Sequence, residues 1–118
     1  MKNESKKISR LIDELVTYFM YVFDCPRYTV HYERADTAFL LEFNFEEIDI
    51  EADALEDLRS KLVVRRHPEL EDYYWQLTGE TQDSNELVLV SMMSDSINVD
   101  YEDRTLRLRL RRNRVRKA

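Results

Sequence analysis

Apolar positions near the start of the chain recur at spacings of three and four residues. This period is typical of an amphipathic helix, which we expect over Ile8–Phe23. Ser5 is the expected N-cap, because its hydroxyl can accept a hydrogen bond from a free helical N–H. The Cys25-Pro26 pair should end the helix, since a residue before proline avoids the helical region. The apolar positions are Ile8, Leu11, Ile12, Leu15, Phe19, Val22 and Phe23.

The next two segments alternate between apolar and polar positions, which predicts β-strands. In Tyr28–Glu33 the residues Tyr28, Val30 and Tyr32 face one way, and Thr29, His31 and Glu33 face the other. In Thr37–Phe45 one face carries Phe39, Leu41, Phe43 and Phe45. Only Arg34-Ala35-Asp36 separates the two strands, so we expect an antiparallel hairpin with a short turn.

The middle of the chain is predicted to be helical. Ala52–Val64 has Leu55, Leu58 and Leu62 on one side, and His67-Pro68 interrupts the pattern. A short helix over Glu69–Leu77 follows, with Pro68 at its first turn and Gly79 as its stop. Thr78–Ser84 is a polar loop.

The segment Asn85–Asp95 fits two structures. Leu87 to Val90 is an apolar run that could form a buried strand, but Asn85-Glu86 and the later Met92-Met93 favour a buried helix. On these flanking residues we interpret the segment as a helix.

A second hairpin is expected from Ile97–Tyr101 and Thr105–Arg112 around Glu102-Asp103-Arg104. In its second strand three leucines alternate with Arg107, Arg109 and Arg111, so the arginines should face solvent. The order of elements predicts an α/β (α+β) two-layer sandwich: a four-stranded antiparallel or mixed sheet from two hairpins, with helices packed on one face. Residues 1–112 would form one domain and residues 113–118 a basic tail. The leucines are Leu106, Leu108 and Leu110.

Composition restricts the location and the class of partner. The 118 residues include one cysteine, so no intrachain disulfide can form, and no apolar run is long enough to span a bilayer. The polar N-terminus has no apolar signal region, and we therefore expect a cytoplasmic protein. The net charge of −6 argues against nucleic acid as the partner, although the arginine-rich last strand and tail leave that alternative open.

The sequence shows no complete catalytic, cofactor-binding or metal-ligating set. Gly79 is its single glycine, which excludes the glycine-rich loops that hold phosphate groups. Cys25, His31 and His67 lack the close paired spacing of a structural zinc site. The acidic run Glu46–Asp53 has no turn glycine of the kind that calcium loops use. We therefore predict no cofactor.

Three segments, together with the order of elements, carry a family resemblance. They are Glu14-Leu15-Val16-Thr17-Tyr18, the hairpin Tyr28–Phe45, and the terminal unit of Leu87–Asp95, Ile97–Asp100 and Arg104–Leu108. This arrangement resembles the histidine-kinase-like ATPase superfamily, and in particular the anti-sigma-factor serine kinases. The resemblance implies that Glu14 stands at the place of the catalytic base and Thr105 at that of the family's closing threonine.

The same resemblance implies that the nucleotide site is lost. Tyr18 stands where the family has a metal-binding asparagine, and Glu46–Glu51 replaces the aspartate and glycines that hold adenine. Asp83-Ser84-Asn85 stands where a glycine pair would surround the phosphates. We therefore expect a non-catalytic regulatory or protein-interaction module, a degenerate relative of these kinases. The alternatives are a residual nucleotide-binding protein or serine kinase, and a nucleic-acid binder.

Two groups of residues are the expected partner-binding sites. Tyr73, Tyr74 and Trp75 are adjacent on one short helix and cannot all face inward, so Tyr74 and Trp75 are candidates for exposed interface anchors. The second group is Arg107, Arg109 and Arg111 on the last strand. Because the middle of the chain is acidic and its end is basic, the expected partner is a protein: a second copy in a homodimer, or an acidic protein.

Overall fold

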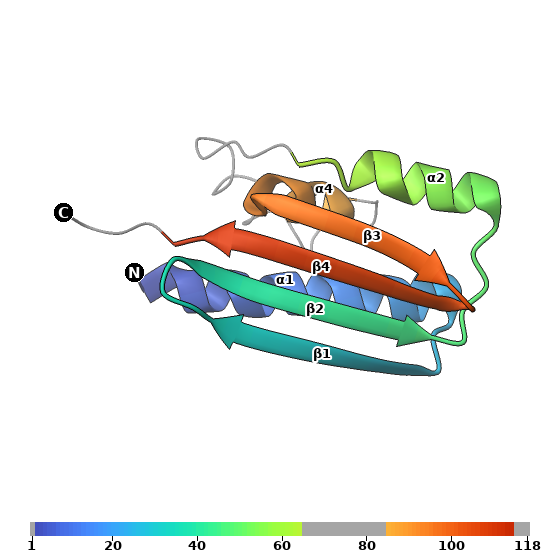
Figure 1. The fold of residues 1–118 in the computed structure, drawn as a ribbon, viewed down its shortest axis with the longest axis horizontal. Helices are drawn as coiled ribbons and strands as arrows, with labels where there is room; N and C mark the ends of the chain where they lie inside the picture. The colour runs from blue at the N-terminus through green and yellow to red at the C-terminus, as the bar shows by residue number, and fades with distance from the viewer. Residues whose placement is uncertain (1, 65–84, 115–118) are drawn as a thin grey trace.

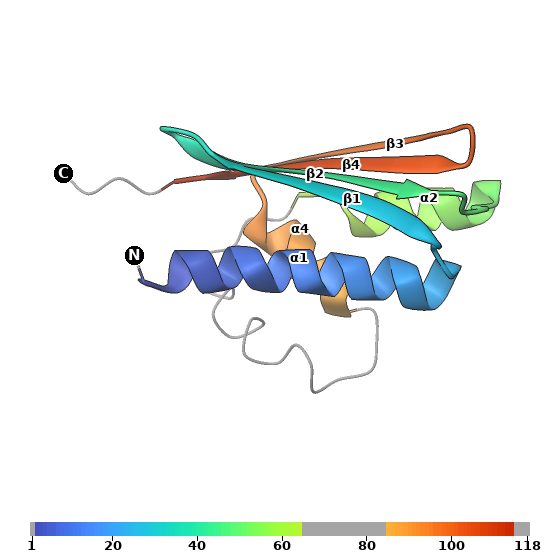
Figure 2. The same cartoon turned by 90° about the horizontal axis from the view of Figure 1, so that it is seen from below.

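A computed structural model of the chain describes residues 2–64 and 85–114, which form two layers (Figure 1). In the view turned by 90°, the sheet forms one layer and the helices form the other (Figure 2). This is the predicted α+β sandwich, with both hairpins in one sheet. The elements are α1 (Lys2–Phe23), β1 (Arg27–Arg34), β2 (Ala38–Glu46), α2 (Ala52–Lys61), α4 (Asn85–Met93), β3 (Ser96–Glu102) and β4 (Thr105–Asn113).

The sheet has four strands in the order β1-β2-β4-β3, and all neighbours are antiparallel. Both hairpins therefore form as expected, and the choice between an antiparallel and a mixed sheet is decided for the antiparallel one. The two central strands come from different hairpins: Leu41 of β2 lies opposite Leu110 of β4, and Phe43 opposite Leu108. This long-range pairing places the chain's most apolar strand faces in the middle of the sheet.

The core lies between the central strands and the helices. Phe19 of α1 is fully buried, and its ring stacks on that of Phe45 in β2 at a centroid distance of 4.5 Å. Leu11 and Leu15 extend the same helix face along the sheet. The buried apolar side chains of α4, Leu87, Leu89, Val90 and Met93, fill the other half of the core.

The first helix begins earlier than its apolar period indicates. Ser5 lies inside α1 and is not its N-cap, because the helix begins at Lys2. The reason is tertiary: Arg112, at the end of β4, donates through Nε to Glu4 Oε1 at 2.9 Å and through Nη2 to Glu4 Oε2 at 3.0 Å. A two-pronged ion pair of this kind holds a polar first turn that has no apolar stripe of its own.

The second helix ends earlier than expected. The predicted helix Ala52–Val64 extends only to Lys61, and Leu62 closes it by donating its N–H to Leu58 O at 3.0 Å. The expected helix Glu69–Leu77 and the loop Thr78–Ser84 lie outside the described residues.

The ambiguous segment after residue 84 is a helix, as interpreted from the sequence. Two serines on α4 and just after it are buried, which would be costly if their hydroxyls were unpaired. Ser91 donates to Val88 O at 2.7 Å, and Ser94 donates to Val90 O at 2.8 Å. These bonds to the preceding turn are available only in a helix, so the polar atoms are compatible with burial.

The last strand extends one residue further than expected, to Asn113. Arg114 then donates its backbone N–H to Thr37 O and its Nη1 to Ala35 O, both at 2.8 Å. Its guanidinium also lies 5.7 Å from the ring centroid of Phe39. The chain is therefore held against the β1–β2 turn at residues that the sequence assigned to the tail.

None of the helices in the described ranges is both long and apolar enough to cross a membrane.

Candidate functional site

The face of the sheet that the helices leave open carries the three arginines predicted to face solvent. Along β4 the leucines are buried, and Arg107, Arg109 and Arg111 are exposed. The strict alternation follows from the two-residue period of a strand packed on one side. The sequence thus placed these side chains correctly.

Antiparallel pairing brings residues from β2 and β3 beside the arginines. Arg107 lies opposite Asn44 and Asp100, and Arg109 lies opposite Glu42 and Asn98. Arg111 lies opposite Leu40 and Ser96, so it has no carboxylate directly across either neighbouring strand.

The hydrogen bonds and ion pairs show how unevenly the arginines are neutralised. Arg107 donates through Nε to Asn44 Oδ1 at 2.9 Å and lies 3.6 Å from Glu42 Oε2. Arg109 Nε lies 3.8 Å from the other oxygen of the same carboxylate. One glutamate is thus shared by two guanidinium groups at long distances, and both stay about half exposed.

The third arginine has only neutral partners among its hydrogen bonds. Arg111 donates through Nε to Asn113 Oδ1 at 3.0 Å and through Nη2 to Thr37 Oγ1 at 3.4 Å. Both contacts are exposed. This end of the open face therefore offers positive charge to a ligand.

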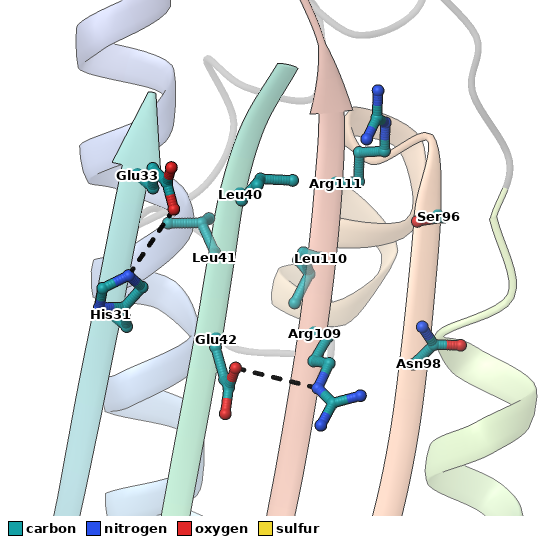
Figure 3. Close-up of a pocket in the computed structure, with 10 residues that line it drawn as sticks. All are labelled: His31, Glu33, Leu40, Leu41, Glu42, Ser96, Asn98, Arg109, Leu110 and Arg111. Carbon is teal, nitrogen blue, oxygen red and sulfur yellow. Dashed lines mark ion pairs between the residues drawn. The ribbon is translucent and has the colours of Figure 1, made fainter. Parts of the chain in front are cut away.

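A hollow with a volume of about 470 Å³ lies on the open face, beside Arg109 and Arg111. Figure 3 shows Glu42 directed at Arg109, while Arg111 stands apart from both carboxylates drawn. His31 Nε2 lies 4.0 Å from Glu33 Oε1 at the β1 side of the hollow. The lining residues come from all four strands: His31, Glu33, Leu40, Leu41, Glu42, Ser96, Asn98, Arg109, Leu110 and Arg111.

The chemistry of this hollow suits binding. Its groups are hydrogen-bond donors, acceptors and charges, and Leu40 adds an apolar contact. Within residues 2–64 and 85–114, no three or more His, Cys, Asp or Glu side chains gather closely enough to hold a metal ion. Cys25 lies before β1, where its buried thiol donates to Arg27 O at 3.1 Å.

Several of the acidic residues after β2 are engaged with arginines at the end of the sheet. Asp49 accepts from Arg104 Nε at 2.8 Å, and this hydrogen bond lowers the pKa of the Asp49 carboxyl below its ordinary value. Glu47 and Glu46 pair with Arg27, and their hydrogen bonds and charges raise the pKa of that guanidinium. These pairs hold the strand ends together, and they leave the hollow unaffected.

The three residues that the resemblance places at a nucleotide site, Glu14, Tyr18 and Thr105, do not line the hollow. Glu14 is largely buried on α1 and accepts a hydrogen bond from Arg10 Nε at 3.0 Å. Tyr18 packs edge-on against Phe19, with ring centroids 5.1 Å apart. Thr105, at the start of β4, is half-buried and donates to Asp103 O at 3.5 Å.

Arg112 is a basic residue of the last strand whose role the sequence did not indicate. It is 4% exposed and points to the helix layer, where it also donates to Met93 O at 2.9 Å. The alternation along the strand was the available signal, because Arg112 follows Leu106, Leu108 and Leu110 at the same two-residue spacing and so shares their face. The other predicted partner-binding residues, Tyr74 and Trp75, lie outside the described residues.

No model of a known protein family matches the chain, and no curated protein matches its sequence.

Proposed function

We propose that the protein is a non-catalytic interaction module whose open sheet face binds an acidic segment of a protein partner. One observation supports this above the others: Arg107, Arg109 and Arg111 lie in a row on an uncovered sheet face, and their ion pairs involve one carboxylate, Glu42, which lies 3.6 Å from Arg107 and 3.8 Å from Arg109. Carboxylates of a partner can pair with guanidinium groups two-pronged, which gives both charge and geometry for recognition.

The surroundings of the arginines favour a peptide over a small anion. The hollow runs across all four strands, and it combines charge with the apolar side chain of Leu40 and the amide of Asn98. An extended peptide presents alternating side chains to such a surface and can satisfy both kinds of contact. Glu33 and Glu42 on the same face would repel the evenly spaced phosphates of a nucleic acid, whereas a peptide can place its few carboxylates at Arg109 and Arg111 and neutral residues beside the glutamates.

We also propose that the chain descends from the histidine-kinase-like ATPases and has lost their nucleotide site. The order of elements supports it, and Tyr18 at the expected metal-binding position supports loss of the nucleotide site. A cytoplasmic location is also proposed, consistent with a single buried thiol at Cys25.

Calorimetry with a short glutamate-rich peptide tests the proposal. We expect saturable binding that weakens as salt rises, because exposed charges are screened. Arg109→Gln combined with Arg111→Gln should weaken it about fivefold to thirtyfold, if each exposed pair contributes about 0.5–1 kcal/mol. Arg59→Gln, which removes one positive charge from an exposed position on α2, is the control and should leave the affinity unchanged.

Other outcomes of the same titrations would replace the proposal. Duplex DNA that binds more tightly than the peptide, with the same loss in the double variant, would establish the nucleic-acid alternative. Magnesium ATP that binds more tightly than about 0.1 mM, near −5 kcal/mol, would establish a residual nucleotide site.

A further inference from the structure

The strand at one edge of the sheet, β1, is long and poorly guarded. It spans Arg27–Arg34 and pairs only with β2 within the described residues. The charges lie near its ends, while the middle, Tyr28–Tyr32, carries no carboxylate, lysine or arginine. Folded proteins usually protect such an edge with charges, proline, bulges or a covering segment, because its free N–H and C=O groups attract another strand.

The hairpin fixes which residues of β1 present their backbone outward. Ala35 donates its N–H to Ala38 O at 2.8 Å across the turn. In an antiparallel ladder hydrogen-bonded and non-bonded pairs alternate. The odd-numbered residues of β1 therefore bond to β2. Tyr28, Val30 and Tyr32 turn their N–H and C=O groups to the free edge.

The side chains of the same residues are incompletely covered by the helix layer. Tyr28 is 39% exposed and Tyr32 is 46% exposed, although both are on the side of the sheet that faces α1. Their rings lie against Phe45 and Phe39, at centroid distances of 6.0 and 6.4 Å. Each tyrosine thus has an exposed flank beside the free edge.

We propose that β1 pairs with β1 of a second copy of this chain, antiparallel, about a twofold axis at Val30. In one continuous sheet the open faces of both copies lie on the same side, so odd-numbered residues must meet odd-numbered residues. An axis at Val30 sets Arg27 opposite Glu33 of the second copy, twice because the axis is twofold. Arg27 also pairs with Glu46 and Glu47 of its own chain, but its side chain is still 59% exposed. Tyr28 then lies opposite Tyr32 of the second copy, where cross-strand aromatic pairs stabilise a sheet.

Neighbouring registers lack this complementarity. An axis at His31 brings two imidazoles together and leaves Arg27 without an opposite carboxylate. The charge pattern therefore selects the axis at Val30.

The opposite edge is less suited to the same pairing. In β3 the open-face residues include Asp100 and Glu102, and no cation on that strand could meet them from a second copy. The hydroxyl of Tyr101 donates to Ile48 O at 2.8 Å and accepts from Ile50 N–H at 3.1 Å. These two bonds hold Tyr101 of β3 to residues 48–50 on the helix side of the sheet.

Dimerisation through β1 would also bring two hollows close together. His31 and Glu33 line the hollow from β1, so the axis at Val30 sets the two open faces side by side. The proposed dimer is argued from the backbone, tyrosines and charges of β1, and it does not rest on the proposed function. Peptide binding could fail while the dimer is found, and the reverse is equally possible.

Charge reversal in two separate variants tests both the partner and the register. Arg27→Glu alone sets a carboxylate against Glu33 of the other copy, and Glu33→Arg alone sets two guanidinium groups together. Each variant should dimerise about fivefold to thirtyfold more weakly than wild type in sedimentation velocity, if each of the two pairs contributes about 0.5–1 kcal/mol. Mixed in equal amounts they should form a heterodimer, in which one cross-strand pair joins two new charges of opposite sign and the other joins the two native ones.

The backbone is tested by proline at matched positions of the two edges. Val30→Pro removes an outward N–H without breaking the ladder to β2, so the fold is retained by circular dichroism and the dimer is lost. Val99→Pro makes the same change on β3 and should leave the dimer intact. A wild-type chain that stays monomeric up to about 0.5 mM overturns the proposal, as that bounds the association near −4.5 kcal/mol. Three other results also overturn the proposal. The two charge variants fail to form a heterodimer when mixed, the dimer is lost in Val99→Pro but not in Val30→Pro, or the chain grows into filaments through β1 and β3.

Discussion

Replacing Arg112 by alanine should destabilise this protein far more than replacing its neighbour Arg111. The Arg112 side chain is 4% exposed and bonds both oxygens of Glu4, whose side chain is 17% exposed, and it also donates to Met93 O. The substitution leaves a carboxylate and a helix-end carbonyl without these donors. Removal of one partner from a buried ion pair costs about 3–5 kcal/mol.

The expected cost lies at the lower end of that range, about 3 kcal/mol, because water can partly solvate Glu4 once the arginine is gone. Arg111→Ala removes only exposed hydrogen bonds and should cost about 0.5 kcal/mol or less. Urea unfolding followed by circular dichroism measures both. With a slope of about 1–3 kcal/mol per molar urea, the Arg112 variant should unfold about 1–3 M earlier than wild type.

A second variant distinguishes two causes of the lost stability: the Glu4 carboxylate left without Arg112, and the packing lost with the arginine side chain. Glu4→Leu combined with Arg112→Met replaces both charges by apolar groups, and it should recover most of the lost stability. Equal midpoints for the Arg111 and Arg112 variants would refute the reasoning, as would a double variant as unstable as Arg112→Ala.

Three further changes probe separate parts of the fold. Leu108→Ala, in the fully buried row of β4, should cost about 2–5 kcal/mol, and Arg109→Ala under about 0.5, both measured by denaturant unfolding. Asp24 closes α1 at φ 54°, so Asp24→Gly should raise the free energy of unfolding by about 0.5–1 kcal/mol in the same assay. Because Arg104 lowers the pKa of Asp49, that pair stabilises the fold above the ordinary value of 3.8 and is lost as pH falls through the lower folded pKa. The difference in melting temperature between wild type and Asp49→Asn should therefore shrink as pH drops below 3.8.

Within the described residues, local patterns in the sequence were sufficient for the type of each helix and strand, although not for the start of α1 or the end of α2, and for the faces of β4. The alternation in β4 placed Arg107, Arg109 and Arg111 on the open face, and Asn85-Glu86 with Met92-Met93 identified α4 as a helix. Both are properties of the nearest neighbours along the chain, for which the period of hydrophobic positions is a direct signal.

Features that depend on contacts between residues far apart in the chain could not be predicted from the sequence. The role of Arg112 requires Glu4, more than a hundred residues away, so neither the start of α1 nor the partner of this arginine had a local signal. The exposure of Tyr28 and Tyr32 likewise depends on which strand is at the edge of the sheet, and the sequence does not show that order. The hollow requires all four strands in their observed register.

The location of peptide binding tests the central claim most directly. Backbone and arginine side-chain resonances of the ¹⁵N-labelled protein would be followed by NMR while a glutamate-rich peptide is added. The open-face account predicts that shifts concentrate at Arg109, Arg111 and their cross-strand neighbours Leu40 and Asn98, and that they disappear at high salt. Shifts confined to the exposed faces of α1 or α2, or no shifts at peptide concentrations in the millimolar range, would contradict it.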